Sequence, residues 1–85
     1  MKPMDIEEIE KRVIEVLSDK ASMDVQQITL QSRLVDDLGL DSLDAVEMVF
    51  EIEESYGIDI PDDQIQEFKT AQDIVTYLSL RLSSG

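Results

Sequence analysis

The sequence predicts a small all-α protein, a bundle of three main helices and one short helix that forms a single domain over residues 1–85. Apolar residues recur with the helical period in three separate segments. Each of these segments opens with a side chain that can cap a helix. The hydrophobic content of 42% is close to that of globular proteins, so we expect a folded chain.

The first helix is predicted from Ile6 to Ser18. Asp5 and Glu8 have the spacing of a capping box at its start. Its apolar stripe consists of Ile6, Ile9, Val13, Ile14 and Leu17. The segment 19–40 that follows shows no sustained period, and a loop of this length needs buried side chains to hold it. The expected anchors are Val25, Ile28, Leu34 and Leu38.

The second helix is predicted from Ser42 to Ser55, with Gly57 suited to the left-handed position after it. One face of this helix is acidic and carries Asp44, Glu47, Glu51 and Glu54. The opposite arc is apolar and carries Ala45, Val46, Met48, Val49, Phe50, Ile52 and Tyr56. Leu43 and Met48 lie at the margins of the two faces, and Glu53 falls inside the apolar arc without a sequence-level explanation.

The C-terminal part of the chain is predicted to hold the short helix and the last main helix. Residues 58–61 are expected to form an extended connector, after which Asp62 caps a single turn that carries Ile65 and Phe68. Thr70 and Asp73 have the spacing of a second capping box. The apolar stripe of the last helix consists of Ala71, Ile74, Val75, Leu78 and Leu82.

Composition excludes several functional classes. The chain has no His and no Cys, so triad-type nucleophilic catalysis and thiolate metal sites are excluded. The carboxylates do not follow the spacing of a calcium-binding loop, and no metal site is predicted. No apolar run reaches the roughly 20 residues of a membrane span, and no signal peptide is evident, so we expect a soluble, cytoplasmic monomer without stable membrane insertion.

Negative charge is concentrated in the middle of the chain. The net charge is −13, and no Lys or Arg occurs between Leu34 and Phe68. Such a surface repels nucleic acid and anionic lipid, and it attracts basic proteins. The acidic face of the second helix is either a solvated surface or a docking surface for a cationic partner. Like charges at i, i+3 and i+4 disfavour the first reading, because they cost about 0.2–0.5 kcal/mol per pair.

Ser42 is the one hydroxyl within the acidic string of residues 36–44. Ser42 or Asp41 could cap the second helix. If Asp41 is the cap, the Ser42 hydroxyl is left exposed at the first helical position. The absence of nearby basic residues disfavours a free phosphate ligand there, whereas a covalently attached phosphodiester needs no binding energy to stay. Regulatory phosphorylation is disfavoured by the neighbouring carboxylates.

The string Asp37-Leu38-Gly39-Leu40-Asp41-Ser42-Leu43-Asp44, followed by Val46-Glu47-Met48, resembles the prosthetic-group attachment motif of acyl carrier proteins. The likeness extends to Ile60-Pro61-Asp62 and to Thr70-Ala71-Gln72-Asp73, and so covers nearly the whole chain. It implies a discrete carrier with 4′-phosphopantetheine, transferred from coenzyme A by a separate transferase, on Ser42 between Asp41 and Leu43. Acyl groups would be held on it as thioesters and delivered to enzymes of fatty-acid, polyketide or specialised lipid biosynthesis.

The resemblance also implies roles for individual residues of a non-catalytic carrier. Acidic residues would meet basic patches on partner enzymes, and the matching positions are Asp41, Asp44, Glu47, Glu53 and Glu54, with Leu43 and Met48 as apolar contacts. Residues expected to line an acyl cavity between the helices are Val46, Val49, Phe50, Ile65, Phe68 and Ile74. The alternative is an unmodified acidic adaptor that binds basic proteins through the second helix, which leaves Asp41-Ser42-Leu43 unexplained.

Overall fold

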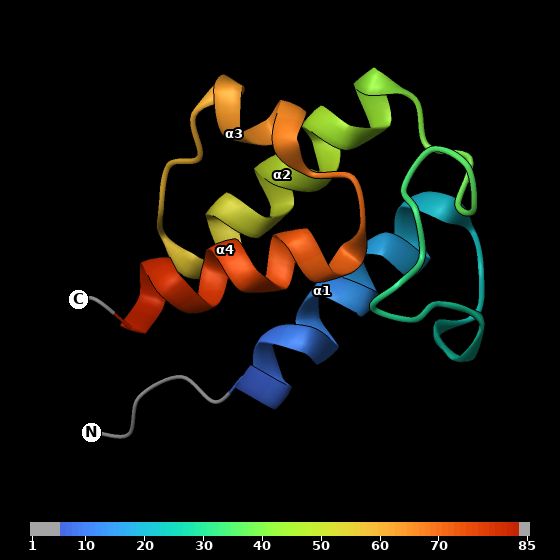
Figure 1. Cartoon of the computed structure of the whole chain (residues 1–85), viewed down its shortest axis with the longest axis horizontal. Coiled ribbons are helices and arrows are strands. Elements are labelled where there is room, and N and C mark those ends of the chain that lie inside the picture. Colours follow the sequence, from blue (N-terminus) through green and yellow to red (C-terminus); the bar gives the residue numbers. More distant parts are fainter. Residues whose placement is uncertain (1–5, 84–85) are drawn as a thin grey trace.

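The computed structural model describes residues 6–83, and these form an all-α bundle (Figure 1). The main helices are α1 (Ile6–Ala21), α2 (Ser42–Tyr56) and α4 (Ala71–Ser83). The short helix α3 (Asp62–Glu67) follows α2, and a single 3₁₀ turn, η1 (Val25–Gln27), lies in the long loop between α1 and α2. Helix α1 packs against both α2 and α4, and α3 packs against α2. The predicted fold class is therefore confirmed.

Helix α1 is longer than predicted, because it ends without a glycine. Its last residue is Ala21 rather than Ser18. Ser22 then adopts a left-handed backbone conformation (φ 55°), and the amide of Met23 donates to the carbonyl of Ser18 at 3.1 Å. A non-glycine residue rarely takes this position, so the sequence carries no clear stop signal. The predicted capping box at Asp5 lies outside the described residues.

The long loop is held by the start of α4. The amide of Leu34 donates to the carbonyl of Lys69 at 3.0 Å. In return, Ala71 and Gln72 donate their amides to the carbonyls of Ser32 and Leu30, at 3.2 and 2.8 Å. These two amides belong to the first turn of α4, where no intrahelical acceptor exists. The loop thus satisfies the free amides of α4, and α4 fixes the path of the loop.

Capping side chains complete the start of α4 as predicted. The amide of Thr70 donates to the Asp73 carboxylate at 3.1 Å, and the amide of Asp73 donates to the Thr70 hydroxyl at 3.3 Å. The prediction for α3 was wrong in one respect. Pro61 is the N-cap, without a side-chain hydrogen bond, and Asp62 is the first helical residue. Proline sets the extended backbone that precedes the turn, so no side-chain cap is needed there.

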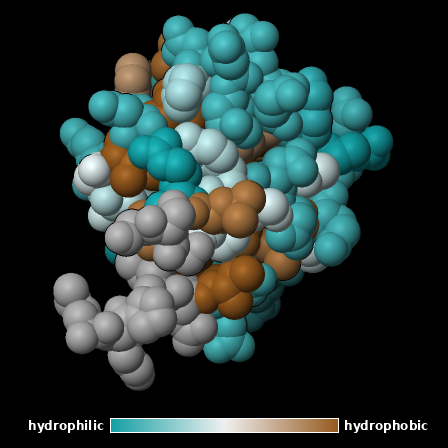
Figure 2. Space-filling model, turned by 60° about the vertical axis from the view of Figure 1, so that its left-hand side comes forward, coloured by the Kyte–Doolittle hydropathy of each residue, from teal (hydrophilic) through white to brown (hydrophobic). Residues whose placement is uncertain are grey.

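The core is apolar and continuous across the three main helices and the loop. The anchors Ile28, Leu34 and Leu38 are buried as predicted, whereas Val25 is 45% exposed on η1. Leu40, which was not predicted as an anchor, is 3% exposed. The side chains that are almost wholly buried are Ile9, Leu17, Met48, Ile52, Ile74, Leu78, Val13, Val49 and Val75. On the face shown in Figure 2, small hydrophobic patches are separated by predominantly hydrophilic residues.

Two residues of α2 differ in exposure from their predicted roles: Met48, predicted at the margin of the apolar arc, lies in the core, and Phe50, predicted inside the arc, lies at the surface. Met48 is 0% exposed, whereas Phe50 is 59% exposed. Successive helical residues advance by about 100°, so Met48 falls about 40° from the buried Ile52, and Phe50 falls about 20° from the exposed Leu43. The predicted apolar arc was too wide on the Phe50 side. The predictions of Met48 as a partner contact and of Phe50 as a cavity residue are therefore wrong.

Truncation of these two side chains should have very different effects on stability. We expect Met48→Ala to lower the free energy of unfolding by about 2–5 kcal/mol, because it leaves a cavity in a packed core. Phe50→Ala should change it by about 0.5 kcal/mol or less, because Phe50 contributes to the surface. Urea denaturation followed by circular dichroism would measure both values. A larger loss for Phe50→Ala than for Met48→Ala would contradict the assignment of α2 faces.

Candidate functional site

Ser42 is the first residue of α2, and Asp41 rather than Ser42 caps the helix. The Asp41 carboxylate accepts the amide of Asp44 at 2.8 Å, and the Asp44 carboxylate accepts the amide of Asp41 at 3.3 Å. These reciprocal bonds form a capping box with aspartate at both positions. Ser42 is exposed. Its hydroxyl makes no hydrogen bond to any of residues 6–83 within the usual distance, so the cap leaves it available.

A compact turn leads into this site. The amides of Asp37 and Leu38 both donate to the carbonyl of Arg33 at 3.0 Å, and the amide of Leu40 donates to the carbonyl of Leu34 at 2.9 Å. Gly39 has a φ of 68°, a left-handed conformation that costs glycine little. Leu34, Leu38 and Leu40 are all buried. Three leucines therefore anchor the segment that places Asp41 and Ser42 at the surface.

Asp37 holds the same turn through its carboxylate. This carboxylate accepts the backbone amide of Arg33 at 2.8 Å and the guanidinium of Arg33 at 3.3 Å. The hydrogen bond from the Arg33 amide, followed by the one from its side chain, lowers the pKa of Asp37 below its ordinary value. Arg33 also lies 3.5 Å from Asp36. Arg33 thus places its charge beside the turn and not at Ser42.

The surroundings of Ser42 fit a covalently attached phosphate better than a bound one. The hydroxyl lies at a helix N-terminus, where free amides and the macrodipole favour an anion. The nearest charged side chains in sequence, Asp41 and Asp44, are acidic and would repel a free phosphate. A covalent bond removes the need for a cationic pocket. Among residues 6–83, no group of three or more acidic side chains is arranged to hold a metal ion.

Comparison with known proteins agrees with this geometry. The family model described as "Phosphopantetheine attachment site" matches residues 11–78. The acyl carrier proteins of Rickettsia canadensis (strain McKiel) and Rickettsia prowazekii (strain Madrid E) are each 46% identical to this chain over 77 residues. Each comparison covers 91% of this chain and 90% of the relative. The chain belongs to the acyl carrier protein family. Its cofactor is 4′-phosphopantetheine.

The exposed face of α2 is where this acyl carrier protein differs most from the sequence prediction. Leu43, Glu47, Phe50 and Glu54 follow one another at i, i+4, i+7 and i+11 and form a single exposed stripe, which we call the α2 stripe. Leu43 is 64% exposed and Phe50 is 59% exposed. The spacing of seven residues between them was the signal in the sequence that could have identified Phe50 as a surface residue. Apolar and acidic side chains therefore alternate along the stripe.

Three further acidic residues of α2 have partners within the fold. The Glu53 carboxylate accepts the amide of Ile60 at 2.6 Å, which ties the connector after α2 back to the helix. This bond explains why an acidic residue lies in the apolar arc, and it makes Glu53 part of the fold rather than of a free surface. Glu51 is bound instead by Lys20 of α1 at 2.8 Å, and Glu47 lies 3.6 Å from the same amine.

The pairing by Lys20 corrects the expectation of unrelieved repulsion on the acidic face. Within the sequence of the second helix, the acidic face carries only like charges. The fold brings the last turn of α1 beside the middle of α2, and a cation from α1 partly neutralises Glu47 and Glu51. No periodicity within either helix indicates this contact, because it depends on how the two helices pack.

The predicted acyl-cavity residues divide into three groups. Val49, Phe68 and Ile74 are buried in the core, Val46 and Ile65 are half-buried, and Phe50 is exposed. The structure contains a groove of about 400 Å³ beside Phe50, lined by Glu53, Glu54, Gly57, Ile58 and Asp59. This groove lies at the surface. Of the six predicted acyl-cavity residues, Phe50 lines the groove and the other five do not. The cavity role of the five inner residues stays a prediction.

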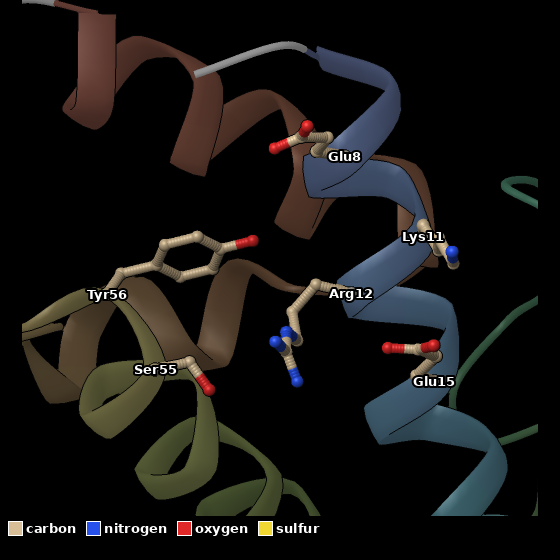
Figure 3. Close-up of a pocket in the computed structure, with 6 residues that line it drawn as sticks. All are labelled: Glu8, Lys11, Arg12, Glu15, Ser55 and Tyr56. Carbon is tan, nitrogen blue, oxygen red and sulfur yellow. The ribbon is translucent and has the colours of Figure 1, made fainter. Parts of the chain in front are cut away.

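A second cleft, of about 470 Å³, separates α1 from the end of α2 (Figure 3). Arg12 extends from α1 towards Ser55 and Tyr56 of α2, and Glu8, Lys11 and Glu15 complete the lining. Burial raises the pKa of the Tyr56 hydroxyl. Ser55 lies thirteen residues beyond Ser42, about 20 Å along the helix axis. This charged cleft is therefore distant from the attachment motif and unsuited to an acyl chain.

The capping geometry predicts effects of different size on stability for two adjacent residues. Asp41→Ala should lower the free energy of unfolding by about 1 kcal/mol, because the amide of Asp44 loses its acceptor. Ser42→Ala should change it by about 0.5 kcal/mol or less. Asp41→Asn, which keeps a capping oxygen, is the matched control and should retain most of the stability. Thermal denaturation measures all three, and an equal loss for Ser42→Ala and Asp41→Ala would show that the hydroxyl is part of the cap.

Proposed function

We propose that this chain is a discrete carrier that receives 4′-phosphopantetheine on the Ser42 hydroxyl and presents acyl groups to partner enzymes. The observation that carries the proposal is the capping of α2 by Asp41, which leaves Ser42 exposed and unbonded at the first helical position. Asp41 and Leu43 flank the hydroxyl on either side. The family model spans this position, and the relatives are named acyl carrier proteins.

The chain's own chemical contribution is limited to an oxygen nucleophile and its placement. A serine hydroxyl is a weak nucleophile unless a base activates it, and the chain has no His and no Cys. Activation therefore falls to a separate phosphopantetheinyl transferase, and the carrier performs no catalysis of its own. When attached, the prosthetic group supplies a terminal thiol, the functional group that this Cys-free chain lacks.

Docking of partner enzymes is assigned to the α2 stripe. Leu43 offers apolar area next to Ser42, and Phe50 offers apolar area two turns further along the helix. Glu47 adds negative charge between these two residues, and Glu54 adds it beyond Phe50. Asp41, Asp44 and Glu51 add charge beside the stripe. A partner with cations around an apolar recess would match this pattern, since complementary charge steers encounter and apolar burial holds the complex.

The unmodified acidic adaptor is not favoured. It accounts for the charge of α2, but it gives no reason for an exposed serine directly after a turn that is anchored by three buried leucines. None of the helices within residues 6–83 combines the length and apolar character of a membrane span. A monomeric state, a cytoplasmic location and the particular biosynthetic pathway stay predictions.

Attachment is tested by the mass of the intact protein. Incubation of the apoprotein with coenzyme A and a broad-specificity transferase should add one phosphopantetheine to the wild type. Ser42→Ala should add none, although it keeps the fold because Asp41 remains the cap. Addition to the Ser42→Ala variant would refute Ser42 as the site, and no addition to a folded wild-type apoprotein would refute the carrier role.

Docking is tested by the transferase KM for apo-carrier variants. We expect Leu43→Ala and Phe50→Ala each to raise KM by about tenfold, equivalent to about 1.4 kcal/mol of lost apolar contact, with a smaller effect on kcat. Leu80→Ala is the matched control, because Leu80 is 66% exposed on α4 and should leave KM unchanged. Equal KM values for the three variants would remove the α2 stripe as the docking surface for this partner.

A further inference from the structure

Lys20 lies at a position that the proposed function does not explain. Its amine is 2.8 Å from the Glu51 carboxylate and 3.6 Å from that of Glu47. The Lys20 side chain is 21% exposed, whereas those of Glu47 and Glu51 are 50% and 41% exposed. The amine thus lies against α2 between two carboxylates that remain open to solvent on their other sides.

The contact involves the α2 stripe itself. Glu47 is the residue between Leu43 and Phe50 on the stripe, and Glu51 lies one helical turn further on. The hydrogen bond to Glu51 and the attraction of both carboxylates raise the pKa of Lys20, so the amine stays charged at neutral pH. Among residues 6–83, the ion pairs of α2 are those with Lys20.

Lys20 also has a structural role at the end of α1. A cation in the last turn of a helix interacts favourably with the macrodipole, and the pairs join α1 to α2. Pairs this exposed contribute little to stability. They nevertheless occupy carboxylate oxygens, and a cation from outside the chain cannot form the same contacts without displacing or sharing Lys20. The ion pairs of Lys20 therefore weaken the binding of a partner's cations to these carboxylates, even though they add little to the stability of the fold.

We propose that Lys20 is an internal competitor for the cations of docking partners at Glu47 and Glu51. This inference rests on the proposed function, since it concerns partners of the α2 stripe. It makes Glu47 on the α2 stripe and Glu51 beside it weaker sites than Asp44 and Glu54, which form no ion pair with a lysine among residues 6–83. Partners that place their cations near the two ends of the stripe are consequently favoured over partners that place them at its centre.

The test compares transferase KM values for two lysine variants of the apo-carrier. Lys20→Gln should lower KM by about two- to fivefold at low ionic strength, the factor that corresponds to a surface ion pair, with kcat unchanged. Lys11→Gln is the matched control, because it removes the same charge from the same helix without breaking a described ion pair. The difference between the two variants should shrink as salt is added.

A double-mutant cycle locates the effect. In a Glu47→Gln/Glu51→Gln background, Lys20→Gln should no longer lower KM more than Lys11→Gln does. Lys20→Arg keeps the charge and should resemble the wild type, which guards against an indirect effect on folding. Equal KM shifts for Lys20→Gln and Lys11→Gln would overturn the inference and leave only net charge. A wild-type apoprotein that is not modified at all would instead overturn the proposed function.

Discussion

The exchange of hydrogen bonds between the long loop and the start of α4 is the contact on which the position of the proposed attachment site depends. The first turn of any helix has amides without intrahelical acceptors, and α4 directs two of them at the carbonyls of Leu30 and Ser32. The return bond from the Leu34 amide to the Lys69 carbonyl fixes the loop two residues beyond the buried Ser32. From Leu34 onward, the chain reaches Asp41 through a turn with three buried leucines. Helix α4 therefore positions Ser42 without touching it.

Electrostatics in this protein follow from a shortage of cations. The chain holds 7 Lys and Arg residues against 20 Asp and Glu residues. The fold pairs two of these cations with carboxylates. Arg33 pairs with Asp37 in the turn before Ser42, and Lys20 pairs with Glu47 on the α2 stripe. Asp41, Asp44 and Glu53 satisfy backbone amides instead. Some carboxylates thus stabilise the fold through backbone amides, and Asp41 and Asp44 do so while still adding negative charge beside the α2 stripe.

Much of the fold and the exposed position of Ser42 could be predicted from local patterns. The helix starts at Ser42 and Ala71 follow from capping residues, and Gly57 ends α2 in the left-handed conformation (φ 65°) as expected. The Ser42 hydroxyl was predicted to be exposed if Asp41 served as the cap of α2, and Asp41 is the cap. These features depend on residues within three or four positions of one another, where spacing in the sequence corresponds directly to spacing in the structure.

What could not be predicted depends on packing between distant segments. Phe50 was assigned to the wrong face, and Met48 was wrongly expected to reach a partner, because the direction of the core around α2 is set by α1 and α3 and not by α2 itself. The roles of Lys20 and Glu53 require partners that lie far away in sequence or beyond the helix end. Leu40 was missed because the loop closes back on itself only once Leu34 is held by α4. In each case the deciding contact crosses between elements.

The separation of the cap from the nucleophile has a consequence for how the loaded and unloaded forms are told apart. Because the Ser42 hydroxyl belongs neither to the cap nor to the core, replacing its proton by a phosphodiester breaks no contact of the described fold. If Ser42 is the attachment residue, as proposed, loading leaves the capping box at the start of α2 in place. Ser42 would then give no conformational signal of loading, and an enzyme that must choose one form would have to sense the arm directly.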